Sequence, residues 1–178
     1  RLYLQVMAAQ PKDAAAPHLL GVVRAQQGRN GEALELIGAA LKIRPDAPEI
    51  LSNYANVLKA QGRFAEALEN YDRALAIKPD YAAALTKRGL VLRELGRLPE
   101  ALESVDRALA LNANYAEGLS TRGAILSDLG RPDEALASYD RALAVARDYP
   151  DVWSNRALTL KTMKRPVEAL ASVERALA

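Results

Sequence analysis

The sequence predicts an all-α fold made of similar helix–turn–helix units placed side by side. The pair Gly-Arg recurs every 34 residues, with its glycine at positions 28, 62, 96 and 130. The triplet Glu-Ala-Leu keeps the same interval and begins three residues after each of these arginines. Alanine and leucine, which favour helix over strand, supply most of the hydrophobic half of the chain. A period of this length is typical of stacked units that bury their apolar faces only against one another.

Residues 48–81 show how one unit is expected to fold. Leu51 and Leu58 lie seven positions apart on one apolar stripe, which indicates a first helix. Gly62 then ends that helix, because glycine adopts the left-handed backbone conformation of a C-terminal cap without a steric penalty. A second helix follows the Gly-Arg turn. Lys164 takes the place of this glycine in the last unit, so we expect its backbone to be strained.

The same register, applied to the whole chain, predicts a single array of about eleven helices. Residues 1–13 match the end of a unit, so they are expected to form the second helix of a truncated repeat. The predicted full repeats are 14–47, 48–81, 82–115 and 116–149, and the last repeat, 150–178, is incomplete.

Small residues recur wherever this register makes two helices cross closely. They form one row in the first helices, from Gly21 onward, and two rows in the second helices, from Ala33 and Ala40 onward. With the repeat length, the turn glycine and the prolines Pro45 and Pro79, these rows make the sequence resemble the tetratricopeptide repeat along its whole length. The resemblance implies a right-handed superhelical solenoid whose first helices line a concave groove. It also implies a protein-interaction scaffold.

Composition and residue types argue against several other classes of function. Lys and Arg number 24 against 22 Asp and Glu, and a net charge of +2 is too small to indicate a nucleic-acid partner or an anionic membrane. The chain has no cysteine and a single histidine, so the sequence predicts no metal site and no cofactor. No apolar run approaches the roughly 20 residues of a membrane span. No nucleophile–base motif is present, so we expect no catalysis within this segment.

The first helices carry a second, polar stripe that is distinct from the buried one. Short side chains on this stripe leave room for the backbone of a guest, and asparagine amides can donate to and accept from its peptide groups. The stripe therefore predicts a site for an extended peptide or a partner helix, although ordinary solvated helices have the same composition. The candidate peptide-binding residues are Ser52, Asn53, Asn56, Lys59, Thr86, Lys87, Arg93, Ser120, Thr121 and Asn155.

A narrower resemblance concerns the repeat arrays that precede O-linked N-acetylglucosamine (O-GlcNAc) transferase-like catalytic domains. The inner asparagine ladder of those arrays matches Asn53 and Asn155, whereas Leu19, Lys87 and Thr121 interrupt it. The alternative function is therefore that of a substrate-selecting segment of a larger glycosyltransferase of that kind. The clamp that other tetratricopeptide domains use for acidic chaperone tails is not rebuilt in this sequence.

Arg88, Arg122 and Arg156 lie on a half-buried stripe of the predicted first helices. The charge of each therefore needs a partner or a route to water. An aspartate precedes each of them by 16 residues, which places both groups at one level of an antiparallel helix pair. We therefore predict ion pairs between neighbouring helices, the alternative being that the arginine heads reach solvent. The predicted pairs are Asp72 with Arg88, Asp106 with Arg122, and Asp140 with Arg156.

The remaining expectations concern two single residues and the ends of the array. Trp153 aligns with Leu51, Leu85 and Leu119, so it is interpreted as a core residue. The lone histidine, His18, is interpreted as a surface or packing residue, the alternative being a ligand-binding residue of the first unit. Neither terminal helix has a dedicated polar cap, so end-to-end self-association between copies of the chain is also expected.

Overall fold

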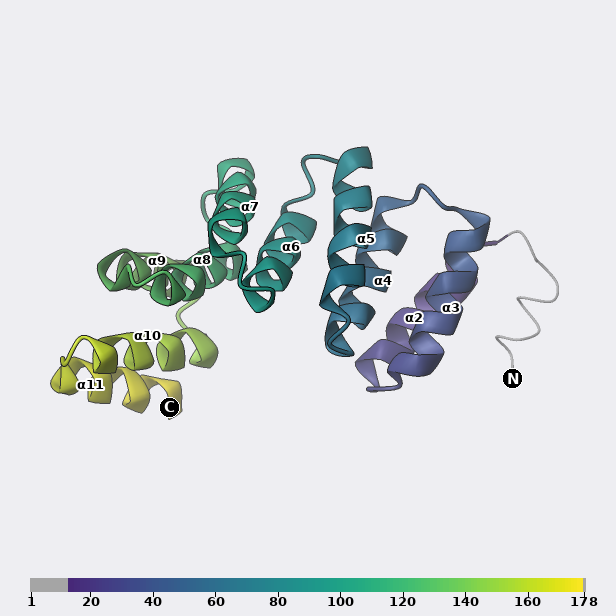
Figure 1. Ribbon diagram of the computed structural model, residues 1–178. Coiled ribbons are helices and arrows are strands. Elements are labelled where there is room, and N and C mark those ends of the chain that lie inside the picture. Colours follow the sequence, from purple (N-terminus) through teal and green to yellow (C-terminus); the bar gives the residue numbers. More distant parts are fainter. Residues whose placement is uncertain (1–12, 178) are drawn as a thin grey trace. The chain divides into compact units, whose positions relative to one another are not determined.

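The computed structural model describes residues 13–177, and between these residues it consists of ten helices without a strand (Figure 1). The predicted all-α fold class is confirmed. The predicted second helix of a truncated repeat, residues 1–13, lies outside the described residues apart from Asp13. The helices are α2 (Ala15–Gln26), α3 (Asn30–Ile43), α4 (Pro48–Ala60), α5 (Phe64–Ile77), α6 (Ala82–Glu94), α7 (Leu98–Leu111), α8 (Ala116–Asp128), α9 (Pro132–Val145), α10 (Pro150–Thr162) and α11 (Pro166–Leu177).

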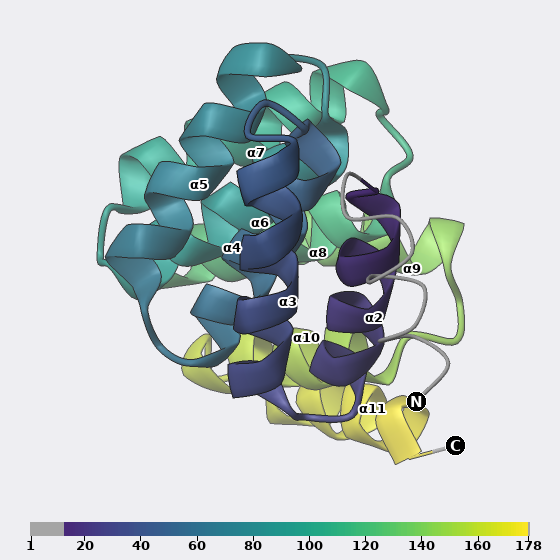
Figure 2. The same ribbon diagram turned by 90° about the vertical axis from the view of Figure 1, so that its right-hand side faces the viewer.

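The helices belong to two compact units, and the division falls within α6, between Val91 and Leu92. In the first unit α2 packs mainly against α3, and α4 against α5. In the second unit α8 packs mainly against α9, and α10 against α11. Figures 1 and 2 show the members of the α2–α3 and α10–α11 pairs lying side by side. Because α3 also contacts α4 and α9 also contacts α10, neighbouring hairpins within each unit share an apolar face.

A glycine in the left-handed backbone conformation ends the first helix of every described hairpin except the last. Gly62 has a φ of 73°, and the amide of Arg63 donates to the carbonyl oxygen of Leu58 at 3.0 Å. This bond closes a Schellman motif, in which a residue with positive φ ends the helix. Lys164 stands at the equivalent position with a φ of 59°, which confirms that a side chain is forced into the left-handed region there.

Replacing Lys164 by glycine is expected to raise the free energy of unfolding by about 0.5–1 kcal/mol, because the left-handed conformation no longer crowds a Cβ atom. The greater freedom of glycine in the unfolded chain offsets part of the gain. Denaturant unfolding monitored by circular dichroism measures the change. The reverse substitution, Gly130→Lys, serves as the control, because an added Cβ at Gly130 meets nothing within 4 Å and only the φ of 72° opposes it. A destabilised Lys164→Gly variant would contradict the assignment.

The arginine that follows the turn pairs with the glutamate of the Glu-Ala-Leu triplet. Arg63 donates from Nε and Nη2 to the two carboxylate oxygens of Glu66, at 2.7 and 2.6 Å. These hydrogen bonds hold the pKa of Glu66 below its ordinary value. The Gly-Arg pair and the Glu-Ala-Leu triplet therefore recur at the same interval because the arginine of the first binds the glutamate of the second. The same two-bond pair joins Arg97 to Glu100, Arg131 to Glu134 and Arg165 to Glu168.

Close helix packing in the second unit depends on a residue without a side chain. Gly123 of α8 lies against the ring of Tyr139 of α9, and a Cβ added at Gly123 would lie 2.7 Å from Cδ1 of that ring. Tyr139 is 1% exposed, and its burial raises the pKa of its hydroxyl to about 12.

Trp153 is half-buried and packs against the same core, which confirms its interpretation as a core residue. Its indole N–H donates to the carbonyl oxygen of Arg147 at 3.3 Å.

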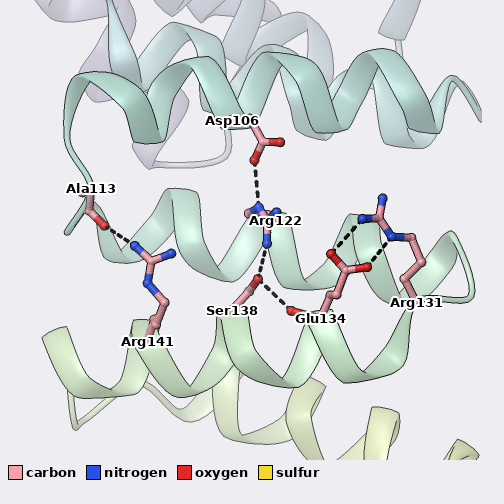
Figure 3. A network of polar contacts seen from close by, with 7 residues as sticks. All are labelled: Asp106, Ala113, Arg122, Arg131, Glu134, Ser138 and Arg141. Atoms are coloured by element: carbon pink, nitrogen blue, oxygen red, sulfur yellow. Dashed lines mark hydrogen bonds and ion pairs between the residues drawn. The ribbon is translucent and has the colours of Figure 1, made fainter.

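The three arginines of the half-buried stripe join neighbouring helices. Figure 3 shows Arg122 of α8 between Asp106 of α7 and Ser138 of α9. Its Nη1 donates to Ser138 Oγ at 2.9 Å, a contact that the sequence did not predict. A surface pair of this kind contributes about 0–1 kcal/mol. The predicted ion pairs are confirmed, with Nε–Oδ1 distances of 2.6 Å for Arg88–Asp72, 2.7 Å for Arg122–Asp106 and 2.8 Å for Arg156–Asp140.

Candidate functional site

The first unit contains a hollow of about 380 Å³ between α2, α3 and α4, which we call the α2–α4 hollow. Its volume lies in the range of about 300–1,000 Å³ that is usual for ligand sites. Apolar side chains form its floor, and four side-chain amides stand among them. The lining residues are Val22, Ala25, Gln26, Asn30, Ile37, Asn53, Asn56, Val57 and Ala60.

A chain of hydrogen bonds orients the two asparagines of α4. The hydroxyl of Tyr71 donates to Asn56 Oδ1 at 2.6 Å. Asn56 Nδ2 donates to Asn53 Oδ1 over a longer 3.4 Å, and Asn53 Nδ2 lies 2.8 Å from Nε2 of His18. The chain runs from a buried tyrosine of α5 through α4 to α2. The two amides are therefore held in place from both ends.

The imidazole of His18 accepts the last hydrogen bond. Partial burial lowers the pKa of His18, and the charge of Glu49 opposes that shift only in part. A neutral imidazole can accept from Asn53 at Nε2 when its proton is on Nδ1. All donors in the chain then point in one direction, from Tyr71 toward His18.

The two asparagines keep hydrogen-bonding capacity beyond this chain. An amide group offers two N–H donors and two acceptor lone pairs, and each asparagine uses one donor and one acceptor in the bonds described above. Each therefore retains a donor and an acceptor. Such a pair is suited to a peptide group, which carries one N–H and one carbonyl.

Three of the predicted peptide-binding side chains are buried. Ser52, Thr86 and Thr121 are 4%, 0% and 5% exposed, so the expectation of a polar stripe distinct from the buried one is wrong at these positions. The hydroxyl of Thr121 donates to the carbonyl oxygen of Glu117 at 2.8 Å, so its own helix satisfies it. The other predicted residues are half-buried: Asn53, Asn56, Lys59, Lys87, Arg93, Ser120 and Asn155.

Of the predicted residues, Asn53 and Asn56 line the α2–α4 hollow together. Arg93 belongs to the second unit, where its Nε donates to Asp128 and this bond raises the pKa of the guanidinium. Asn155 of α10 accepts the hydroxyl of Thr159 at its backbone carbonyl, at 3.0 Å. Arg93 and Asn155 therefore take part in contacts within the second unit and are not among the residues that line this hollow.

Sequence reasoning favoured a surface or packing role for His18 over ligand binding, and it missed Tyr71. His18 lies 34 residues before Ser52, which the polar stripe includes, so the repeat register places it on that stripe. Tyr71 lies on a second helix and is 0% exposed, which the sequence presents as a core residue. Nothing in the period indicates that its hydroxyl reaches α4.

The described residues show no group of three or more His, Asp or Glu side chains that could hold a metal ion. Among residues 13–177, none of the helices combines the length and the apolar run that crossing a membrane requires.

Antiparallel helical hairpins with a recurring glycine turn and closely packed small residues define an α-helical repeat protein. Sequence models of the tetratricopeptide repeat match residues 12–80, 46–114 and 80–148, and a second such model matches residues 121–178. The chain belongs to the tetratricopeptide repeat (TPR) family. A comparison with curated proteins found no match.

Solved structures with the same fold cover nearly the whole chain. TTC0263, a thermophilic TPR protein of Thermus thermophilus, is 32% identical, with a TM-score of 0.83 over 93% of this chain and 90% of that one. A TPR protein of Parabacteroides merdae is 23% identical, with a TM-score of 0.85 over 98% of this chain and 70% of that one. YrrB, described as a TPR protein with an unusual peptide-binding site, is 21% identical, with a TM-score of 0.73 over 99% of this chain and 91% of that one.

Proposed function

We propose that this protein is a non-catalytic interaction scaffold and that its α2–α4 hollow binds an uncharged, extended peptide segment. The hydrogen-bond chain from Tyr71 to His18 is the observation that carries the proposal. It holds Asn53 and Asn56 at the rim of an apolar floor, with a donor and an acceptor of each amide available for a peptide backbone. Preorientation reduces the ordering cost of binding, so neutral amides become effective contacts.

The floor of the hollow favours a small apolar side chain of the guest. Val22, Ala25 and Ala60 offer hydrocarbon surface, and the polar groups of the rim are amides without charge. Burying a charged guest side chain there would leave its charge without a partner. TPR proteins bind protein or peptide partners, and the peptide-binding site described for YrrB is a further argument for this class of ligand.

Peptides selected from a phage-displayed library on the wild-type chain are expected to lose affinity for the Asn53→Ala and Asn56→Ala variants. The loss of a hydrogen bond worth about 0.5–1.5 kcal/mol predicts a Kd that is about two- to thirteenfold higher, measured by fluorescence anisotropy. Tyr71→Phe keeps the buried ring and removes the hydroxyl that orients Asn56, so it is expected to weaken binding as well. Asn114→Ala, at an exposed amide in a turn of the second unit, is the matched control. Equal affinities of wild type and both asparagine variants would refute the proposed site.

A further inference from the structure

The second unit contains a cleft of about 600 Å³ between α9 and α11, which we call the α9–α11 cleft. Both helices pack against α10, and Trp153 near the start of α10 lines the cleft together with residues of both. None of the described residues lines both this cleft and the α2–α4 hollow. Its volume also lies in the usual range for ligand sites. The lining includes Asp140, Leu143, Arg147, Asp148, Trp153 and Arg175.

Two of these side chains replace residues that other repeats share. Trp153 stands where α4, α6 and α8 carry leucine, and Arg147 stands where Pro45 and Pro79 occupy the turn. The indole N–H of Trp153 donates to the carbonyl oxygen of Arg147. The guanidinium carbon of Arg156 lies 5.9 Å from the centroid of the Trp153 ring, and a cation over an aromatic ring is attracted to it. Two contacts therefore hold the ring in place.

Arg175 differs from the equivalent arginines in its hydrogen bonding. Arg141 of α9 donates from Nη2 to the carbonyl oxygen of Ala113 at 3.0 Å (Figure 3), and the equivalent arginine of α5 makes the same contact one repeat pair earlier. For Arg175 the equivalent acceptor is the carbonyl oxygen of Arg147, which accepts from the indole of Trp153 instead. Among the described residues, none forms a hydrogen bond or an ion pair with the guanidinium of Arg175. Its donors are therefore available.

The exposure of Arg175 is a property of its position in the repeat. Arg73, Arg107 and Arg141 occupy the same position on α5, α7 and α9, and all three are exposed although a further hairpin follows each of them. The contact of Arg141 with Ala113 shows that this position is directed toward the preceding repeat. Arg175 accordingly lines the cleft from the side of α11 that faces α9 and α10.

The charged groups of the cleft leave one positive charge in excess. Asp140 is balanced, because its Oδ1 accepts from Nε of Arg156 at 2.8 Å. The remaining groups are Arg147, Arg175 and Asp148, and within residues 13–177 no ion pair joins any of them to another residue. A ligand group with a single negative charge compensates this excess. A phosphate, with nearly two negative charges, would bring surplus charge close to Asp148.

We propose that the α9–α11 cleft binds a peptide segment in which a glutamate or aspartate adjoins an apolar side chain. The guanidinium groups of Arg147 and Arg175 donate to the carboxylate, since their fork of N–H groups matches its two oxygens. The apolar side chain packs on the ring of Trp153 and on Ala144, which also lines the cleft. This site differs from the α2–α4 hollow in the charge of its ligand, and it does not depend on that hollow.

The probes are pentapeptides of the form Gly-Xaa-Glu-Xaa-Gly, blocked at both ends, in which Xaa is leucine, valine or phenylalanine. Each has a counterpart with glutamine in place of glutamate. Trp153 is the only tryptophan of the chain, so a change in its fluorescence reports binding at this cleft. We expect glutamate peptides to change the emission saturably, and the glutamine counterparts to bind about fivefold more weakly.

Variants of the charged lining test which groups hold the carboxylate. Arg147→Gln and Arg175→Gln are each expected to raise the Kd of the glutamate peptides about threefold, and the double variant to remove the preference for glutamate over glutamine. Asp148→Asn removes a repelling charge and is expected to lower the Kd. Arg141→Gln is the matched control, because it removes an exposed arginine that does not line the cleft. Circular dichroism verifies that each variant is folded.

Three outcomes would overturn the proposal. The first is that no glutamate peptide changes the emission of Trp153, and the second is that Arg147→Gln and Arg175→Gln bind as tightly as Arg141→Gln. The third is tighter binding of peptides with phosphoserine in place of glutamate, which would exclude a carboxylate as the preferred group. Asn53→Ala is expected to leave these titrations unchanged, so a failure at this cleft is distinguishable from a failure at the α2–α4 hollow.

Discussion

Replacing Leu126 by alanine is expected to lower the free energy of unfolding by about 2–5 kcal/mol. Leu126 is 0% exposed and lies in a core cluster with Leu119 and Tyr139, which α8 and α9 share with α10. The substitution removes buried hydrocarbon and leaves a cavity that rigid neighbours fill only in part. Guanidinium unfolding followed by circular dichroism measures the loss.

Leu158→Ala is the matched control for this substitution, because Leu158 is 62% exposed on a first helix of the same unit. Its effect is expected to stay within about 0.5 kcal/mol. Equal losses for the two variants would show that Leu126 does not lie in a shared core.

Replacing Ala101 by leucine is expected to cost about 1–3 kcal/mol through overpacking. Ala101 is 0% exposed on α7, and the alanines at the equivalent positions of the other second helices, such as Ala67 and Ala135, are also 0% exposed. A larger side chain at such a position has to separate the helices or adopt a strained rotamer. The free energy of denaturant unfolding is the measurement.

Ala110→Leu provides the comparison on the same helix, because Ala110 is exposed. It is expected to leave stability within about 0.5 kcal/mol of wild type. An Ala101→Leu variant that unfolds at the wild-type denaturant concentration would mean that the small-residue row does not mark helix crossings.

The turns and the ion pairs between helices were predictable from the sequence because both follow the repeat. The positive φ of Lys164 follows from its alignment with Gly62. The contact between Arg122 and Asp106 follows from their 16-residue spacing across one antiparallel turn. Both features depend on a short segment of known geometry, a helix end in the first case and a turn between two helices in the second.

Burial along the polar stripe could not be predicted in the same way. Ser52 and Asn53 are adjacent and both polar, yet one is buried and the other is half-exposed. A helix turns by about 100° per residue, so neighbours on the edge of a stripe face different surroundings. Which of them a neighbouring helix covers depends on how the helices pack.

The sequence by itself determined the repeat, the helix pairs, the glycine turns and the family, because these are set by residue types at fixed spacing. The α2–α4 hollow and its hydrogen-bond chain were decided by the tertiary structure. His18 and Asn53 lie 35 residues apart and Asn56 and Tyr71 lie 15 apart, on helices that packing brings together. A hydrogen bond requires alignment within a few tenths of an ångström, and such alignment depends on how three helices pack rather than on the period of the sequence.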